Sequence, residues 1–149
     1  MITLLRTNAN NTDFQSLVLL LDQHLKIKDG DEHWFFAQFN KVDNINYVVV
    51  AYKDGVAVGC GAIKDYEGKT VEIKRMFVPE EYRGQGIGHR VLDELEAWAK
   101  ELHYVECILE TGKKQDDAIN LYKKSGYKLM TNYGQYYGVE NSVCMKKVI

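Results

Sequence analysis

The sequence is poor in proline and cysteine. Its 149 residues include one proline and three cysteines. Cys60, Cys107 and Cys144 are far apart and show no C-x-x-C spacing, so neither a disulfide framework nor a zinc ribbon is indicated. Each cysteine lies in an apolar, strand-like run, where a buried, reduced thiol is the expected state. The four histidines show no spacing suited to a metal ion, and we expect no metal site.

Long hydrophobic runs and an excess of one charge are also absent. No apolar run approaches the roughly 20 residues of a membrane span, and the first residues lack the apolar stretch of a signal peptide. Nineteen basic against twenty-one acidic residues give a net charge of −2, which argues against a protein that coats DNA or RNA. We therefore expect a cytoplasmic protein without a membrane or nucleic-acid partner.

The composition and the spacing of apolar residues predict one α+β domain over residues 1–149. Hydrophobic residues make up 46% and charged residues 27%, which excludes general disorder. Alternating and helical spacings of apolar residues predict the order of elements. The predicted strands are 2–6, 47–53, 56–65, 70–78, 105–110, 127–133 and 139–148, and the predicted helices are 12–29, 32–40, 86–102 and 116–124.

Two local signals support this order. Asp54-Gly55 separates two β-branched runs and predicts a hairpin, because both turn residues must tolerate positive φ. Thr12, followed three residues later by Gln15, predicts a capping box at the start of the first helix.

Three of the twelve glycines fall within five residues. Gly84, Gly86 and Gly88 follow Arg83, at the point where a strand ends and a long helix begins. Glycine lets a ligand approach the backbone, and the free amides of a helix N-terminus favour phosphate. A tight turn without a ligand is the simpler alternative. The dinucleotide fingerprint fits poorly, because it needs G-x-G-x-x-G in a βαβ unit, whereas here the third glycine comes one residue early and an antiparallel meander precedes it.

Two segments together resemble a known family. Residues 78–88, Val-Pro-Glu-Glu-Tyr-Arg-Gly-Gln-Gly-Ile-Gly, resemble the pyrophosphate-binding motif R/Q-x-x-G-x-G/A of the GNAT superfamily of acetyl-CoA-dependent N-acyltransferases. Residues 118–127, Ala-Ile-Asn-Leu-Tyr-Lys-Lys-Ser-Gly-Tyr, resemble its second signature, A-x-x-L-Y-x-x-x-G-F/Y. The resemblance implies the GNAT fold, a mixed but mostly antiparallel sheet of about seven strands flanked by about four helices.

The resemblance also implies how acetyl-CoA would be held. Arg83 and the backbone amides that follow it would bind the pyrophosphate; these are the amides of Gly84, Gln85, Gly86, Ile87, Gly88 and His89. In the family the preceding strand is bulged and leaves backbone groups free for the pantetheine arm, here those of Met76, Phe77 and Val78. The Met76 amide would stabilise the oxyanion. Gln115 stands where the family commonly has a cofactor-binding Asn, and Asn120 is a second candidate for this contact.

Two side chains are candidates for catalysis by the same resemblance. Tyr122 matches the family's proton donor to the departing thiolate, and a phenol with a pKa near ~10 starts in the required form. The alternative is that Tyr122 only packs. Glu72 matches a position from which some members supply a general base. Pairing with Lys74 or Arg75 is the alternative role for this glutamate.

The acceptor is the least determined part. We expect a primary amine of a small molecule that attacks acetyl-CoA directly in a ternary complex; acetylation of a protein lysine or N-terminus stays open. Arg75 is a candidate to anchor a substrate carboxylate, and Trp34, Tyr133 and Tyr136 are candidates to wall the substrate. A non-catalytic acyl-CoA-binding module on the same fold is the alternative function, and self-association into a homodimer is left open.

Overall fold

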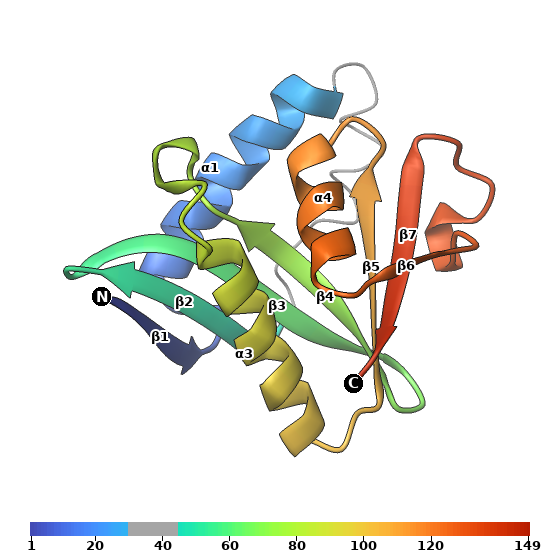
Figure 1. Cartoon of the computed structure of the whole chain (residues 1–149), viewed down its shortest axis with the longest axis horizontal. Helices are drawn as coiled ribbons and strands as arrows, with labels where there is room; N and C mark the ends of the chain where they lie inside the picture. Colours follow the sequence, from blue (N-terminus) through green and yellow to red (C-terminus); the bar gives the residue numbers. More distant parts are fainter. Residues whose placement is uncertain (30–44) are drawn as a thin grey trace.

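The computed structural model describes residues 1–29 and 45–149. This part of the chain forms one mixed sheet with the strand order β1-β2-β3-β4-β5-β7-β6 (Figure 1). The strands are β1 (Ile2–Thr7), β2 (Tyr47–Lys53), β3 (Val56–Glu67), β4 (Thr70–Phe77), β5 (Glu106–Gly112), β6 (Lys128–Met130) and β7 (Ser142–Val148). The helices are α1 (Thr12–Asp29), α3 (Ile87–Glu101) and α4 (Asp116–Lys124), with short 3-10 turns at Glu80–Tyr82 and Gly134–Tyr136.

The predicted α+β fold class is confirmed. Strands β4 and β5 run parallel and the other neighbours in the sheet run antiparallel. The helix expected over 32–40 lies outside the described residues, which hold three α-helices. No helix in the described ranges is long and apolar enough to cross a membrane.

The predicted hairpin between β2 and β3 is confirmed, and the predicted helix cap is corrected. Asp54 and Gly55 have φ of 52° and 81°, as a two-residue hairpin turn requires. At α1, however, the side chain of Asn11 rather than Thr12 accepts the Phe14 amide, at 2.9 Å. Asparagine is among the best N-cap residues, so the cap lies one residue before the predicted position, and the Gln15 side chain donates to the Ala9 carbonyl instead of completing a capping box.

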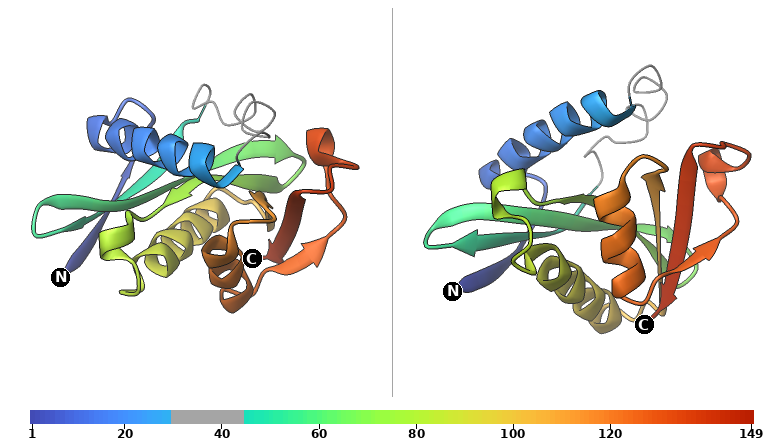
Figure 2. Two further views of the ribbon diagram at one scale, coloured as in Figure 1. Left: turned by 90° about the horizontal axis from the view of Figure 1, so that it is seen from above. Right: turned by 45° about the horizontal axis from the view of Figure 1, so that its top comes forward.

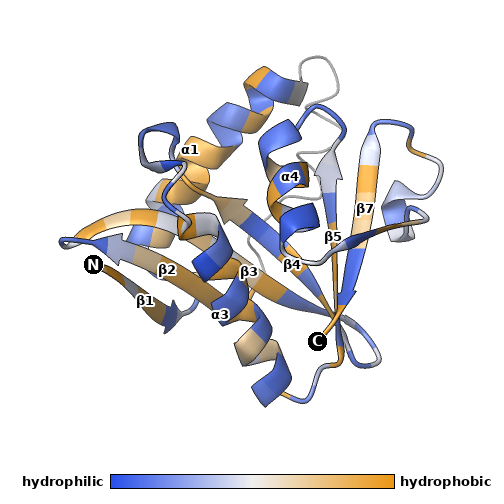
Figure 3. Cartoon of the chain, in the orientation of Figure 1, coloured by the Kyte–Doolittle hydropathy of each residue, from blue (hydrophilic) through white to orange (hydrophobic). Residues whose placement is uncertain are grey.

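Two apolar layers cover the two faces of the sheet. Figure 2 shows α1 on one face and α3 with α4 on the other. Side chains of β2 alternate between the layers, as the two-residue period of a strand requires: Val48 and Val50 pack under α1, whereas Val49 and Ala51 pack under α3. Figure 3 shows the same division along the helices, where apolar and polar residues alternate around α3 and α4.

The parallel pairing of β4 with β5 is short. Thr70, Val71 and Glu72 lie beside residues 106–108, and the two strands then continue for residues 73–77 and 109–112 beyond the last registered pair. Figure 1 shows the strands diverging from their common base. The backbone of both strands is therefore exposed to the space between them.

A β-bulge lies in the diverging part of β4. Between the pairs Cys60–Phe77 and Ala62–Lys74, two residues of β4 oppose Gly61 alone. One of the two, Arg75, has a φ of 57°, which is rare for a residue with a side chain.

One buried cysteine, Cys60, contacts this bulge. All three cysteines are buried free thiols, as predicted. Burial raises the pKa of Cys60 to about 12, so its thiol stays protonated and donates to the Arg75 carbonyl at 3.4 Å.

Gly61 makes room for the bulge. A Cβ built on Gly61 would collide with the Met76 sulfur and would lie 2.8 Å from Leu95 Cδ1. We expect Gly61→Ala to lower the free energy of unfolding by about 1–3 kcal/mol, the usual cost of overpacking, as measured by urea unfolding. In a Met76→Ala background the same Gly61→Ala change should cost less, because the Met76 sulfur is gone and only the contacts to α3 remain. A Gly61→Ala variant as stable as the parent would contradict this packing.

Candidate active site

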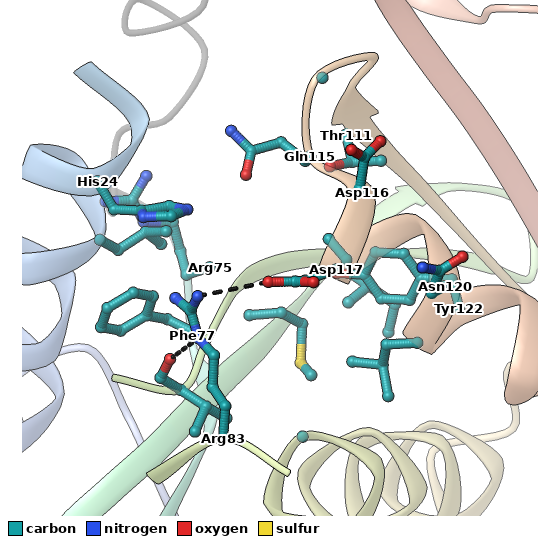
Figure 4. A pocket seen from close by; sticks show the side chains of 18 of the residues that line it. His24, Arg75, Phe77, Arg83, Thr111, Gln115, Asp116, Asp117, Asn120 and Tyr122 are labelled. Carbon is teal, nitrogen blue, oxygen red and sulfur yellow. Dashed lines mark hydrogen bonds and ion pairs between the residues drawn. The ribbon is translucent and has the colours of Figure 1, made fainter. Parts of the chain in front are cut away.

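One cleft of about 870 Å³ opens between the diverging strands. Its walls are α1, β4, the glycine turn that leads into α3, the end of β5, and α4 (Figure 4). Most of the residues singled out from the sequence line it: Glu72, Arg75, Met76, Phe77, Val78, Arg83, Gly84, Gly86, Ile87, Gly88, His89, Gln115, Asn120, Tyr122 and Tyr136. With the α1 residues that also line it, such as Leu21, the cleft joins segments more than 100 residues apart in the sequence.

The glycine turn exposes backbone amides to the cleft. Gly84 and Gly86 have φ of 80° and 77°, and a Cβ at either would meet no atom within 4 Å. Gly86 is the N-cap of α3, whose first turn has no acidic side chain. The leading amides of α3 therefore have neither intrahelical acceptors nor a neutralising carboxylate, which makes this end of the helix suited to an anion.

Gly88 has a different role from its two neighbours. A Cβ there would lie 3.1 Å from Leu121 Cδ2 of α4, so glycine allows the two helices to approach closely. The ring of His89 also joins these helices, because its Nδ1 lies 3.2 Å from Ser125 Oγ and its Nε2 lies 3.2 Å from Asp93 Oδ2 on α3.

The Arg83 guanidinium connects the glycine turn to the end of β4. Its Nε donates to the Val78 carbonyl at 2.8 Å, and its Nη1 lies 3.6 Å from Asp117 Oδ2 at the start of α4. The same group lies 6.0 Å from the centre of the Phe77 ring. Arg83 therefore links the turn, β4 and α4, while remaining partly exposed in the cleft.

The wall of the cleft that faces α1 carries an amide just before α4 and a phenol within α4 (Figure 4). Gln115, the residue before α4, is buried, and its Nε2 has no hydrogen-bond partner. Tyr122 is 6% exposed and its ring contacts Tyr127 edge-on. Burial, and then the charge of Glu110, raises the pKa of Tyr122 well above its usual value, so its phenol is a proton donor over the whole neutral range.

Glu72 is a buried carboxylate held by a tyrosine. It is 7% exposed, and Tyr133 donates its phenol proton to Glu72 Oε2 at 2.6 Å. Lys74 lies farther away, with its Nζ 4.0 Å from Glu72 Oε1, and burial lowers the pKa of this lysine. Tyr133 itself packs edge-on against Tyr136.

Several cleft residues were not anticipated from the sequence. His24 and Lys28 of α1 and Glu110 of β5 line the cleft, and Asp22 of α1 forms an ion pair with Arg75. The sequence of the first helix shows only an apolar stripe at helical spacing. Nothing in it indicates which of its polar residues faces the cleft.

Two predicted residues lie outside the cleft, and a third is not among the described residues. Gln85 and Tyr133 are not among the described residues that line the cleft. The Gln85 side chain accepts a hydrogen bond from Lys53 at 2.8 Å, and Tyr133 lies against Glu72. Trp34 lies outside the described residues.

The family follows from a comparison with known proteins. The model described as the acetyltransferase (GNAT) family matches residues 12–127, which include both sequence motifs. The chain belongs to the GNAT acetyltransferase family. The resemblance of residues 78–88 and 118–127 is thereby confirmed, as are the GNAT fold and the predicted acyltransferase enzyme class.

Individual relatives extend over almost all of this GNAT chain. A protein named IAA acetyltransferase from Azospirillum brasilense is 41% identical over 148 residues, which are 95% of this chain and 96% of the relative. The structure of a candidate acyl-CoA N-acyltransferase from Klebsiella pneumoniae matches with a TM-score of 0.84 and 30% identity, over 99% of this chain and 97% of the other. The PaiA N-acetyltransferase of Thermoplasma acidophilum, solved with coenzyme A, shares the fold with a TM-score of 0.74 at 17% identity, over 100% and 99% of the two chains.

The Tyr133–Glu72 contact gives a prediction on stability. Tyr133→Phe leaves the buried Glu72 carboxylate without its short hydrogen bond, and an unmet buried acceptor costs about 1–3 kcal/mol. We expect that loss in the free energy of unfolding, measured in urea. Tyr137→Phe is the control, because Tyr137 is 75% exposed and surface changes stay within about 0.5 kcal/mol. Equal effects of the two variants would show that the Tyr133–Glu72 bond carries no stability.

Proposed function

We propose that this GNAT protein transfers the acetyl group of acetyl-CoA to the primary amine of a small molecule by direct attack in a ternary complex. One observation carries the proposal: a single cleft joins the uncapped N-terminus of α3 to Tyr122 and Glu72 along the bulged half of β4. The cleft thus contains the four features that thioester aminolysis needs. These are an anion site, an exposed backbone edge, a proton donor and a proton acceptor.

The described residues fit acetyl-CoA, which supplies the reactive thioester. The amides that begin at Gly86 would receive the pyrophosphate, and the partly exposed Arg83 guanidinium would add charge beside it. The Gln115 amide, buried and unpartnered, is a donor that this ligand would satisfy. Solved relatives in this fold hold coenzyme A or acetyl-CoA, which agrees with the assignment.

The bulge in β4 supplies a backbone amide that would bind the thioester oxygen. Met76 follows the residue with positive φ and lies past the last pair of β4 with β5. Its amide would donate to the thioester carbonyl and stabilise the negative charge that develops when the amine attacks the carbonyl carbon.

Glu72 would remove the proton that the acceptor amine must lose. A lysine-like amine with a pKa of ~10.4 is only ~0.04% neutral at pH 7, so a base accelerates the reaction. The hydrogen bond from Tyr133 fixes one carboxylate oxygen, and the other, Oε1, which has Lys74 Nζ at 4.0 Å, would accept the amine proton directly or through water.

Tyr122 would complete the transfer at the opposite wall. As the new C–N bond forms and the C–S bond breaks, the phenol of Tyr122 gives its proton to the departing sulfur, and the products are the amide and the free thiol. An ammonium nitrogen loses two protons on the way to the amide. Glu72 would pass the first to solvent, and the second, lost as the C–N bond forms, would restore the phenol, so both residues end each cycle unchanged.

A panel of primary amines tests the proposal. The purified protein is incubated with acetyl-CoA and each amine in turn, and the released CoA thiol is measured. We expect amine-dependent thiol release for a subset of the panel. Binding of acetyl-CoA without turnover of any amine would favour a non-catalytic acyl-CoA-binding module instead.

Tyr122→Phe separates catalysis from binding. Loss of a general acid lowers kcat by about 10²-fold or more, whereas the dissociation constant for CoA should stay within about 2-fold because no binding contact is removed. Tyr137→Phe, on the surface, should match the parent. The raised pKa of Tyr122 also predicts that the parent's rate does not fall as the pH rises from 7 to about 9.5. An unchanged kcat in Tyr122→Phe would exclude it as the acid.

Gly86→Trp tests the anion site. The indole would cover the amides at the start of α3, and we expect the dissociation constant for acetyl-CoA to rise at least about 10-fold, the loss of one charge-assisted hydrogen bond or more. The matched control is Gly55→Trp, since Gly55 has a similar φ of 81° in an open turn away from the cleft. Unaltered affinity in Gly86→Trp would place the pyrophosphate elsewhere.

A further inference from the structure

We propose that the acceptor is a small amino carboxylic acid, with Arg75 as the residue that binds its carboxylate. The inference rests on the proposed acetyl transfer and assigns the substrate class for the same cleft. A buried cation in the wall of that cleft has hydrogen-bond donors that are only partly paired.

Arg75 is 5% exposed and lines the cleft. Its Nη2 donates to Asp22 Oδ1 at 2.5 Å, whereas its Nε and Nη1 are buried with no hydrogen-bond partner. Buried donors of a charged group are costly when unpaired, and such groups in a folded protein call for an explanation. A carboxylate is the acceptor that a guanidinium binds best among small organic groups.

The position of Arg75 points to the acceptor half of the cleft. Arg75 lies in the bulge, directly before the Met76 amide that would face the thioester oxygen, and it has a φ of 57°. Figure 4 shows Arg75 with His24 on the α1 side of the cleft, across from Gln115 and Tyr122. The pyrophosphate amides lie further along, beyond Arg83, so the pyrophosphate would not compete for the Arg75 guanidinium.

The charges of the cleft suit a molecule with both an amine and a carboxylate. Arg75 and Lys28 are cationic groups on or beside the α1 wall, whereas Glu72 and Glu110 lie on β4 and β5. Glu72 is three residues before Arg75 on the same strand, β4. An amino acid with its carboxylate at the unpaired Arg75 donors and its amine toward Glu72 would meet a cationic donor at one end and a carboxylate at the other, beside the Asp22 and Lys74 partners that these groups already have.

The test compares matched pairs of acceptors that differ only in the carboxylate. Each amino acid is paired with its primary amide, which keeps the amine and removes the negative charge. We expect kcat/KM for the acid to exceed that for the amide by at least about 10-fold, the value of one charge-assisted hydrogen bond. Arg75→Gln should reduce this ratio to near 1. Because the ratio is taken within one variant, partial unfolding cancels from it.

Asp22→Asn is the control, since it removes the ion pair at α1 but keeps the guanidinium, and it should retain the preference for the acid. Equal use of acids and amides by the parent protein would overturn the inference, as would a preference that persists in Arg75→Gln. A rise in KM for acetyl-CoA alone would make Arg75 a cofactor contact and would also overturn it.

Failure of the proposed function gives a different result. If the parent acetylates no amine at all, binding of the amino acids with CoA present, measured by calorimetry, tests Arg75 alone. Binding that is lost in Arg75→Gln and retained in Asp22→Asn supports the carboxylate site, and undetectable binding to the parent overturns it.

Discussion

The separation of β4 from β5 beyond Glu72 and Ile108 is the constraint on which the site depends. It opens the backbone of two central strands to a cleft, whereas paired strands would have covered that edge. The bulge opposite Gly61 is a second departure from regular pairing. It changes the backbone direction at Arg75 and Met76 from that of a regular strand. Helix α4 lies on the far side of the opening and supplies Tyr122, so the same divergence that exposes the backbone also brings the phenol to it (Figure 4).

The cleft concentrates groups that are costly to bury. Glu72, Arg75 and Gln115 are each less than 9% exposed, and two of them have donors without partners. Elsewhere in the described chain the buried carboxylate of Glu96 is fully engaged, by Tyr127 at 2.9 Å and Lys147 at 2.7 Å. Glu96 on α3 is thus satisfied, whereas Arg75 and Gln115 in the cleft keep unpartnered donors, which is the pattern expected where ligands complete the hydrogen bonding.

Local sequence patterns predicted the elements but not the contacts across the fold. The Asp54-Gly55 turn and the glycine turn could be read from adjacent residues because their backbone requirements are local. The N-cap of α1 was misplaced by one residue, because Asn11 and Thr12 are both good caps and the choice depends on geometry. The Tyr133–Glu72 bond joins residues 61 apart and the Arg75–Asp22 pair residues 53 apart, so neither is encoded by spacing. The single domain, the cytoplasmic location and a homodimer stay predictions of the sequence.

A crystal structure with a non-hydrolysable analogue of acetyl-CoA would show how the cleft holds the thioester. We expect the pyrophosphate on the first amides of α3, the analogue's carbonyl oxygen about 3 Å from the Met76 amide, and its sulfur position facing the Tyr122 hydroxyl. A pyrophosphate bound away from the Gly84–Gly86 turn, or a carbonyl oxygen far from the bulge, would contradict this expectation.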